Sequence, residues 1–209
     1  MLWWKEWRET RFGFLTALFF ITGLVWTLPP TITLLDEYWL GIFLMAYTIG
    51  MAVILGSGAV AAEIDADTMQ FIMSKPARRW SIIGTKYAVR LTETAAAFIV
   101  PVLIQINRDN VEMWMWVPPY LFLKYIACAT LSVVFAFSIT FLFSVIFRKQ
   151  ALCALAGISA LLAYLGGRAM DVLKQVYESQ PIDLELYVLT TLCAAAFLAS
   201  LILFKNKEV

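Results

Sequence analysis

The sequence contains no histidine and only three cysteines. The absence of histidine excludes serine–histidine nucleophile pairs, histidine general bases and histidine metal ligands. The three cysteines, Cys128, Cys153 and Cys193, lie in apolar stretches. Their number is odd and their spacing matches no zinc or redox motif, so we expect them to be small buried residues without chemistry of their own.

The sequence also lacks the Gly-x4-Gly-Lys-Ser/Thr loop that cradles nucleotide phosphates. If the protein uses ATP, a separate chain must bind it. Charge is scarce as well, because 15% of the residues are charged and 62% are hydrophobic. A soluble domain has roughly a quarter charged residues. The composition therefore indicates an integral membrane protein, and the net charge of +1 gives no sign of nucleic-acid binding.

Six apolar stretches approach the length of about 20 residues that a helix needs to cross a bilayer. They lie at residues 12–28, 38–62, 81–106, 120–147, 151–166 and 186–204. The sequence therefore predicts an all-α integral membrane protein in which residues 1–209 form a single domain of six transmembrane helices.

The distribution of basic residues indicates how these helices are oriented in the membrane. If the chain crosses six times, twelve of its sixteen basic residues lie on the side that holds both termini. Since cytoplasmic loops carry an excess of lysine and arginine, we expect a multi-pass protein of the plasma membrane with both termini in the cytoplasm. The twelve residues are Lys5, Arg8, Arg11, Lys75, Arg78, Arg79, Lys86, Arg90, Arg148, Lys149, Lys205 and Lys207.

Residues 1–11 place three tryptophans on one face of a helical wheel and four charged side chains on the other. The tryptophans are Trp3, Trp4 and Trp7, and the charged residues are Lys5, Glu6, Arg8 and Glu9. This pattern favours an interfacial helix in the headgroup layer. The alternative is a tryptophan-rich flank that anchors the first span.

Residues 167–185 form an external loop that contains apolar residues at helical spacing. Met170, Leu173, Val176 and Tyr177 follow Gly166 and Gly167 and precede Pro181. The pattern favours a short amphipathic helix that lies at the outer surface or re-enters the membrane. A plain connection between the fifth and sixth spans is the alternative.

The longest polar segment, residues 63–86, follows the second span and has an ordered composition. Three acidic residues precede a short apolar patch, which Pro76 ends before the paired Arg78 and Arg79. Acids and a capping Asp67 or Thr68 suit the start of a helix. The segment therefore predicts a short cytoplasmic helix that either docks in a partner's groove or packs on its own chain.

Two polar features lie within the predicted spans. Glu93 is an acid at membrane depth, where charged groups tend to be functional, but Arg90 lies one turn away and can pair with it. A structural pair and a contact with substrate or proton both remain open. Gly56, Ser57 and Gly58 resemble a serine nucleophile motif, but without histidine the glycines are better explained by close helix packing.

Taken together, these residues resemble the type-2 ABC transporter permease family, the exporter class. In that family the loop after the second span typically has a glutamate, Gly-Thr, an apolar turn, a small residue, a proline, an arginine and a later lysine. This sequence has the same order, with Asp67 in place of the usual glycine and more methionine in the turn. The matching residues are Glu63, Thr68, Met69, Phe71, Ile72, Met73, Ser74, Pro76, Arg79 and Lys86.

The resemblance implies that residues 68–74 form a coupling helix within the element 63–76, which would insert into a cytoplasmic ATPase subunit. It implies that this partner binds ATP and magnesium, and that the chain itself has no cofactor and no catalytic residue. It also implies a second permease, identical or different, with the substrate path between the two permeases and lipid around them. The alternatives are a membrane scaffold or immunity protein that does not transport, and a membrane-embedded enzyme that acts on lipid.

Overall fold

The computed structural model describes residues 2–27, 34–65, 79–108, 119–177 and 183–206. Helices account for nearly all of these residues, and the described part of the chain contains no strand. The helices are α1 (Leu2–Thr27), α2 (Leu34–Gly58), α3 (Ala61–Asp65), α5 (Arg79–Arg108), α6 (Pro119–Ile146), α7 (Gln150–Tyr177) and α8 (Asp183–Asn206). The prediction of an all-α fold is confirmed for this part of the chain.

Several helix ends follow from proline and charge. α1 ends at Thr27, two residues before Pro29, and α6 begins at Pro119. Proline suits the first position of a helix because its missing N–H would have no partner there. Lys205 lies in the last turn of α8, where a cation interacts favourably with the helix dipole.

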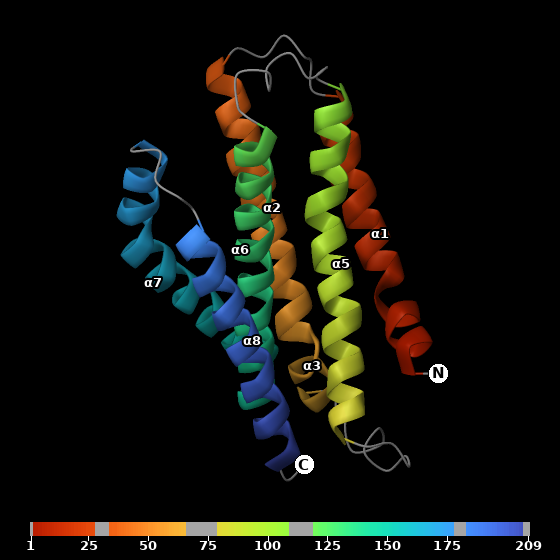
Figure 1. Ribbon diagram of the computed structural model, residues 1–209. Coiled ribbons are helices and arrows are strands. Elements are labelled where there is room, and N and C mark those ends of the chain that lie inside the picture. The colour runs from red at the N-terminus through yellow and green to blue at the C-terminus, as the bar shows by residue number, and fades with distance from the viewer. Residues whose placement is uncertain (1, 28–33, 66–78, 109–118, 178–182, 207–209) are drawn as a thin grey trace.

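The helices form a bundle in which α6 is central and contacts α2, α5, α7 and α8. α1 packs chiefly against α5, at the edge of the bundle (Figure 1). The start of α1 and the end of α8 lie at the same end of the bundle, and so do α3 and the start of α5 (Figure 1). The elements on either side of residues 66–78 therefore lie at the end that holds both termini.

The core of the bundle is an aromatic cluster around Tyr87 of α5. Its ring centre lies 5.2 Å from that of Phe137 and 5.1 Å from that of Phe141, both fully buried on α6. The Tyr87 hydroxyl and the Ser138 hydroxyl are 2.8 Å apart. The Ser138 hydroxyl thus provides a hydrogen-bond partner for the buried hydroxyl group of Tyr87.

Gly56 allows α2 to approach α6 closely. A Cβ atom at this position would lie 3.0 Å from the carbonyl oxygen of Phe137 and 3.2 Å from the backbone nitrogen of Phe141. The neighbouring Ser57 hydroxyl donates to the Ile54 carbonyl of its own helix at 3.2 Å. The prediction that the glycines of this motif serve helix packing is therefore confirmed for Gly56.

Four stretches of the described chain are long and apolar enough to cross a membrane. They are Leu44–Ile64, Trp80–Ile104, Ile126–Ile146 and Leu186–Asn206. These correspond to the predicted second, third, fourth and sixth spans. Gln150–Tyr164, in the predicted fifth span, is apolar but shorter, and the predicted first span is not among the four. The first and fifth spans, and the six-span layout, therefore remain predictions.

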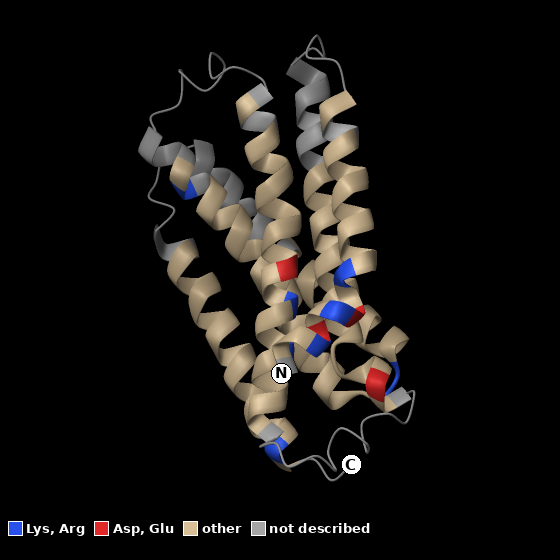
Figure 2. Ribbon diagram, turned by 90° about the vertical axis from the view of Figure 1, so that its right-hand side faces the viewer, with Lys and Arg blue, Asp and Glu red and all other residues tan. Residues whose placement is uncertain are grey.

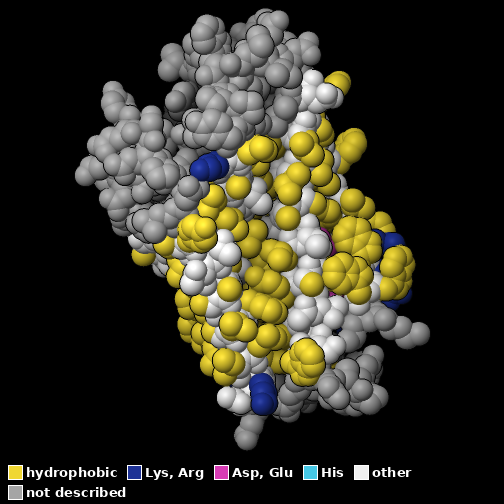
Figure 3. Space-filling view, in the orientation of Figure 1, with side chains coloured by type: hydrophobic (Ala, Val, Ile, Leu, Met, Phe, Trp, Pro, Cys, Tyr) yellow, Lys and Arg dark blue, Asp and Glu magenta, His cyan; other side chains and the backbone are white. Residues whose placement is uncertain are grey.

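Many large apolar side chains of the described residues are exposed on the surface of the bundle. Figure 3 shows hydrophobic side chains over much of the face that it presents. On α1, Phe12, Phe19 and Phe20 are 70%, 81% and 66% exposed. Such a surface is unfavourable in water, and it suits a protein that lies among lipid chains.

Two predicted short helices are not separate elements. The predicted interfacial helix at residues 1–11 continues without a break into the first predicted span, because α1 runs from Leu2 to Thr27. Residues 167–177 of the predicted external helix continue α7, which passes through Gly166 and Gly167. A glycine inside a helix costs only about 1 kcal/mol relative to alanine, which is too little to end a long helix.

Candidate functional site

Most of the charged side chains that Figure 2 colours lie in the half of the bundle that holds both termini. The predicted docking segment belongs to this region of the sequence, but residues 66–78 lie outside the described chain. They include Asp67, Thr68, Met69, Phe71, Ile72, Met73, Ser74 and Pro76. Glu63 on α3 precedes the segment, and α5 begins after it at Arg79, whose side chain also lies outside the description.

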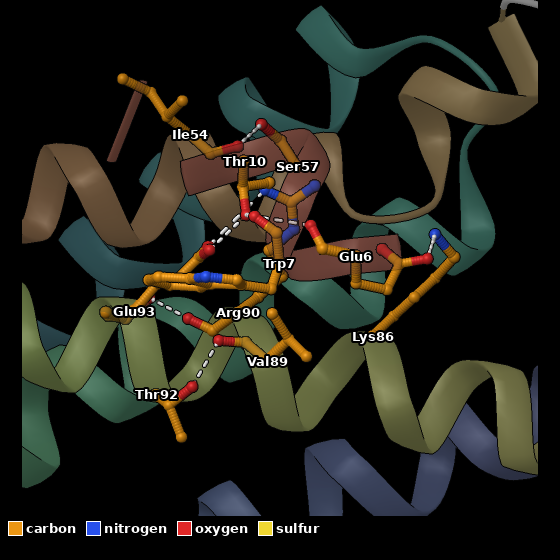
Figure 4. Close-up of polar contacts among 11 residues, drawn as sticks. Glu6, Trp7, Thr10, Ile54, Ser57, Lys86, Val89, Arg90, Thr92 and Glu93 are labelled. Atoms are coloured by element: carbon orange, nitrogen blue, oxygen red, sulfur yellow. Dashed lines mark hydrogen bonds and ion pairs between the residues drawn. The ribbon is translucent and has the colours of Figure 1, made fainter. Parts of the chain in front are cut away.

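Lys86 joins three helices at this end. Its ammonium lies 2.9 Å from a carboxylate oxygen of Glu6 on α1 and 2.5 Å from one of Glu63 on α3. Figure 4 shows the Lys86 side chain extending from α5 toward Glu6. These residues are 80 and 23 positions away from Lys86 in the sequence, so the contacts depend on the packing of the helices.

All three members of this junction are removed from solvent. The side chains of Lys86, Glu6 and Glu63 are 1%, 5% and 16% exposed. Lys86 is the only buried lysine or arginine among the side chains that the structure describes. A buried ammonium requires charged or hydrogen-bonding partners, and the two carboxylates provide them.

A second polar contact lies further along the same pair of helices. Glu93 on α5 is 1% exposed, and it accepts a hydrogen bond from the Thr10 hydroxyl on α1. A guanidinium nitrogen of Arg90 lies 3.7 Å from its other oxygen. The predicted pair of Glu93 and Arg90 is therefore present, and the threonine of α1 is an additional partner (Figure 4).

The helical register explains this alignment. Lys86, Arg90 and Glu93 are spaced by four and three residues, so they share one face of α5. Glu6 and Thr10 are four residues apart and share one face of α1. The two faces meet, and they form a polar seam of Glu6, Thr10, Lys86, Arg90 and Glu93, with Glu63 joining from α3.

The seam corrects the prediction for Glu6, which the sequence pattern places on the charged outer face of an interfacial helix. The structure buries Glu6 against Lys86. Trp3 and Trp4 are exposed as that pattern expects, whereas the ring of Trp7 packs against Phe14 with centres 6.0 Å apart. The spacing of Glu6 and Thr10 is the signal that could have suggested a second, inward-facing polar stripe.

Glu6, Glu9 and Glu63 each place a carboxylate oxygen within 4.8 Å of the others. Carboxylate oxygens can hold hard cations. Here, however, the Lys86 ammonium already bonds to Glu6 and Glu63, and Lys5 pairs with Glu9 at 3.5 Å. This cluster is therefore organised around lysine, because each of its carboxylates already pairs with an ammonium.

Further along α1 and α5 the contact becomes apolar and opens into a shallow groove of about 520 Å³. α1 lines it with Leu15, Thr16, Leu18, Phe19 and Thr22, and α5 lines it with Val100 and Ile104. The tight polar contacts between these helices therefore lie at the end that holds the chain termini, while the other part of the interface is loosely filled.

Comparison with known proteins agrees with this picture of a membrane-embedded helical chain. The chain has no significant match among curated proteins. A family described as ABC-2 family transporter protein matches residues 30–182. The matched part includes Glu63, Lys86, Arg90 and Glu93, and it covers more than half of the sequence. The chain therefore belongs to the ABC-2 transporter family, as a membrane component of an ABC transporter.

Proposed function

We propose that this chain is the permease subunit of an ATP-binding cassette exporter and that a separate cytoplasmic subunit hydrolyses ATP with magnesium. Family membership supports a transport role. The sequence contains no phosphate-binding loop of its own, which requires a partner for any ATP-driven movement. The chain then contributes the path through the membrane and no catalytic group.

The proposed docking element is residues 68–74, with Glu63, Pro76 and Arg79 as its frame. The observation that carries this proposal is the contact of Glu63 with Lys86 at 2.5 Å. Glu63 lies just before the segment and Lys86 lies in the second turn of the helix that follows it. The ion pair connects α3, which precedes the segment, to α5, which follows it. A displacement of the segment by a partner would therefore move α3 and α5 together.

The assembly that follows from this proposal has two permeases, identical or different, and two ATPase subunits. It lies in the plasma membrane with both termini in the cytoplasm, and this placement is supported by the charge distribution and by the common end at which α1 starts and α8 finishes (Figure 1). A reporter that is active only in the cytoplasm, fused in turn to each terminus, tests the orientation. An inactive reporter at either terminus would contradict it.

Introducing a negative charge into the proposed apolar docking surface tests the coupling role. We expect Phe71→Asp or Met69→Asp to abolish co-purification of the proposed ATPase partner, because a carboxylate in an apolar groove loses its hydration. Gln70→Asp is the matched control, since it adds the same charge at a polar neighbour in the same segment. We expect this control to retain the ATPase.

The amount of permease in the membrane must be the same for all variants, and gel filtration in detergent checks this. Undiminished ATPase binding by both Phe71→Asp and Met69→Asp would reject the segment as the docking element. If the wild-type chain retains no ATPase at all, the alternative of a scaffold or immunity protein is favoured instead.

A further inference from the structure

The structure connects the N-terminal part of α1 to the proposed docking segment through one side chain. Lys86 bonds to Glu6 of α1 and to Glu63 of α3 at the same time. A single ammonium is therefore shared by a helix that lies outside the matched family region, which begins at residue 30, and by the helix that precedes the docking segment. This shared contact is a specific joint between the two.

The joint adds a buried polar contact to the packing of α1. Among the described elements α1 packs chiefly against α5. Beyond the polar seam, the interface between the two helices contains the apolar groove. The outer face of α1 carries Phe12, Phe19 and Phe20, which are exposed. Glu6 and Thr10 make the buried polar contacts that hold the N-terminal part of α1 to α5.

Removing three charges from water contributes little net stability to a fold. Removing charges from water opposes their mutual attraction, and well-packed apolar residues of similar volume often stabilise a protein as well or better. A buried ion pair does, however, fix which groups meet and at what position. The arrangement of Glu6, Lys86 and Glu63 thus favours a role in geometry over a role in fold stability.

We propose that Lys86 is a positioning residue that makes the N-terminal part of α1 move together with α3 and α5 when the docking segment is displaced. The inference rests on the proposed function. The two carboxylates hold α1 and α3 to one point on α5, so a displacement of α3 reaches Glu6 through the ammonium. The N-terminal part of α1 is then a second moving element, and Lys86 transmits the movement to it.

An apolar replacement of the whole junction separates positioning from stability. The test variant carries Lys86→Met, Glu6→Leu and Glu63→Leu, which keeps side-chain volume and removes all three charges. The matched control carries Lys5→Met and Glu9→Leu. It removes an ion pair from the same helix, but that pair is 3.5 Å long and its side chains are 34% and 45% exposed.

The readout is the movement of α1 in the complete complex with its ATPase. Trp4 is 61% exposed, so a Trp4→Cys substitution provides a site for a maleimide label. The three native cysteines are replaced by alanine in every variant. The rate of labelling is then measured without nucleotide and with a non-hydrolysable ATP analogue.

We expect nucleotide to change the labelling rate of position 4 in the parent and in the Lys5/Glu9 control. In the apolar junction variant we expect the ratio of the two rates to fall to about one, because the link to α1 is lost. The ATPase is expected to remain bound to this variant. Its hydrolysis rate per bound ATPase is expected to lose its dependence on the permease.

Three outcomes overturn the inference. It is wrong if the junction variant keeps the nucleotide-dependent change, or if the parent shows none while its ATPase is bound. It is also wrong if Lys86→Arg, which keeps the charge, is as defective in this readout as the apolar variant. Failure of the wild-type chain to bind an ATPase is a separate result, and it would reject the proposed function itself.

Discussion

The ammonium of Lys86 on α5 lies 2.9 Å from the carboxylate of Glu6 on α1, and both side chains are almost fully buried. The pair joins the beginning of the chain to the third predicted span. Because Glu63 shares the same ammonium, two carboxylates depend on one cation. Removing that cation should therefore destabilise the protein more than removing an ordinary surface charge.

Loss of Lys86 alone should be strongly destabilising. Lys86→Met leaves the buried Glu6 and the partly buried Glu63 without their cation, and breaking a buried pair typically costs about 3–5 kcal/mol. We expect a clear fall in the thermal unfolding temperature of the detergent-purified protein. Replacing both carboxylates by glutamine in the same protein should recover most of the loss. Lys5→Met, in an exposed pair, should cost less than about 1 kcal/mol.

The sequence predicts four of the spans correctly because hydrophobicity is a local property. Long apolar stretches indicate α2, α5, α6 and α8 directly, and the spacing of Arg90 and Glu93 indicates their pairing. The contact of Glu6 with Lys86 has no local signal, since it depends on how α1 packs on α5. The amphipathic pattern of residues 1–11 is satisfied equally by an interfacial helix and by a helix with an inward polar stripe.

The same distinction applies to the helix ends. Pro119 begins α6, where its missing N–H costs no hydrogen bond, whereas Pro101 lies inside α5, so proline alone does not predict every boundary. The pair Gly166 and Gly167 gives no such boundary, and α7 passes through it. Glycine weakens a helix without blocking it, so the predicted separation of an external helix does not occur at that point.

Thr10 provides a second test of the polar seam. Thr10→Val removes the hydroxyl that donates to the buried Glu93 carboxylate and keeps the side-chain volume. Hydrogen bonds to charged groups contribute about 1.5–3 kcal/mol, so we expect a lower unfolding temperature. Thr22→Val is the control, because the Thr22 hydroxyl donates to the Leu18 carbonyl of its own helix at 2.8 Å. Equal effects of the two substitutions would argue against a special contribution from Thr10.

Gly56 tests the close approach of α2 and α6. An alanine there would place its Cβ atom 3.0 Å from the backbone carbonyl oxygen of Phe137, and overpacking of this kind typically costs about 1–3 kcal/mol. Gly50→Ala is the matched control on the same helix, since a Cβ atom at Gly50 meets nothing within 4 Å. We expect Gly56→Ala to lower the unfolding temperature and Gly50→Ala to leave it unchanged or raise it. The reverse order would contradict the packing.

Purification of the native complex tests the proposed transport function most directly. The wild-type chain, isolated gently from its own membrane, is analysed for the proteins that accompany it and for ATP hydrolysis. The account predicts a stoichiometric partner with a phosphate-binding loop and ATPase activity that is lost when that partner is removed. Isolation of the chain without any ATP-hydrolysing partner, under conditions that preserve other membrane complexes, would contradict it.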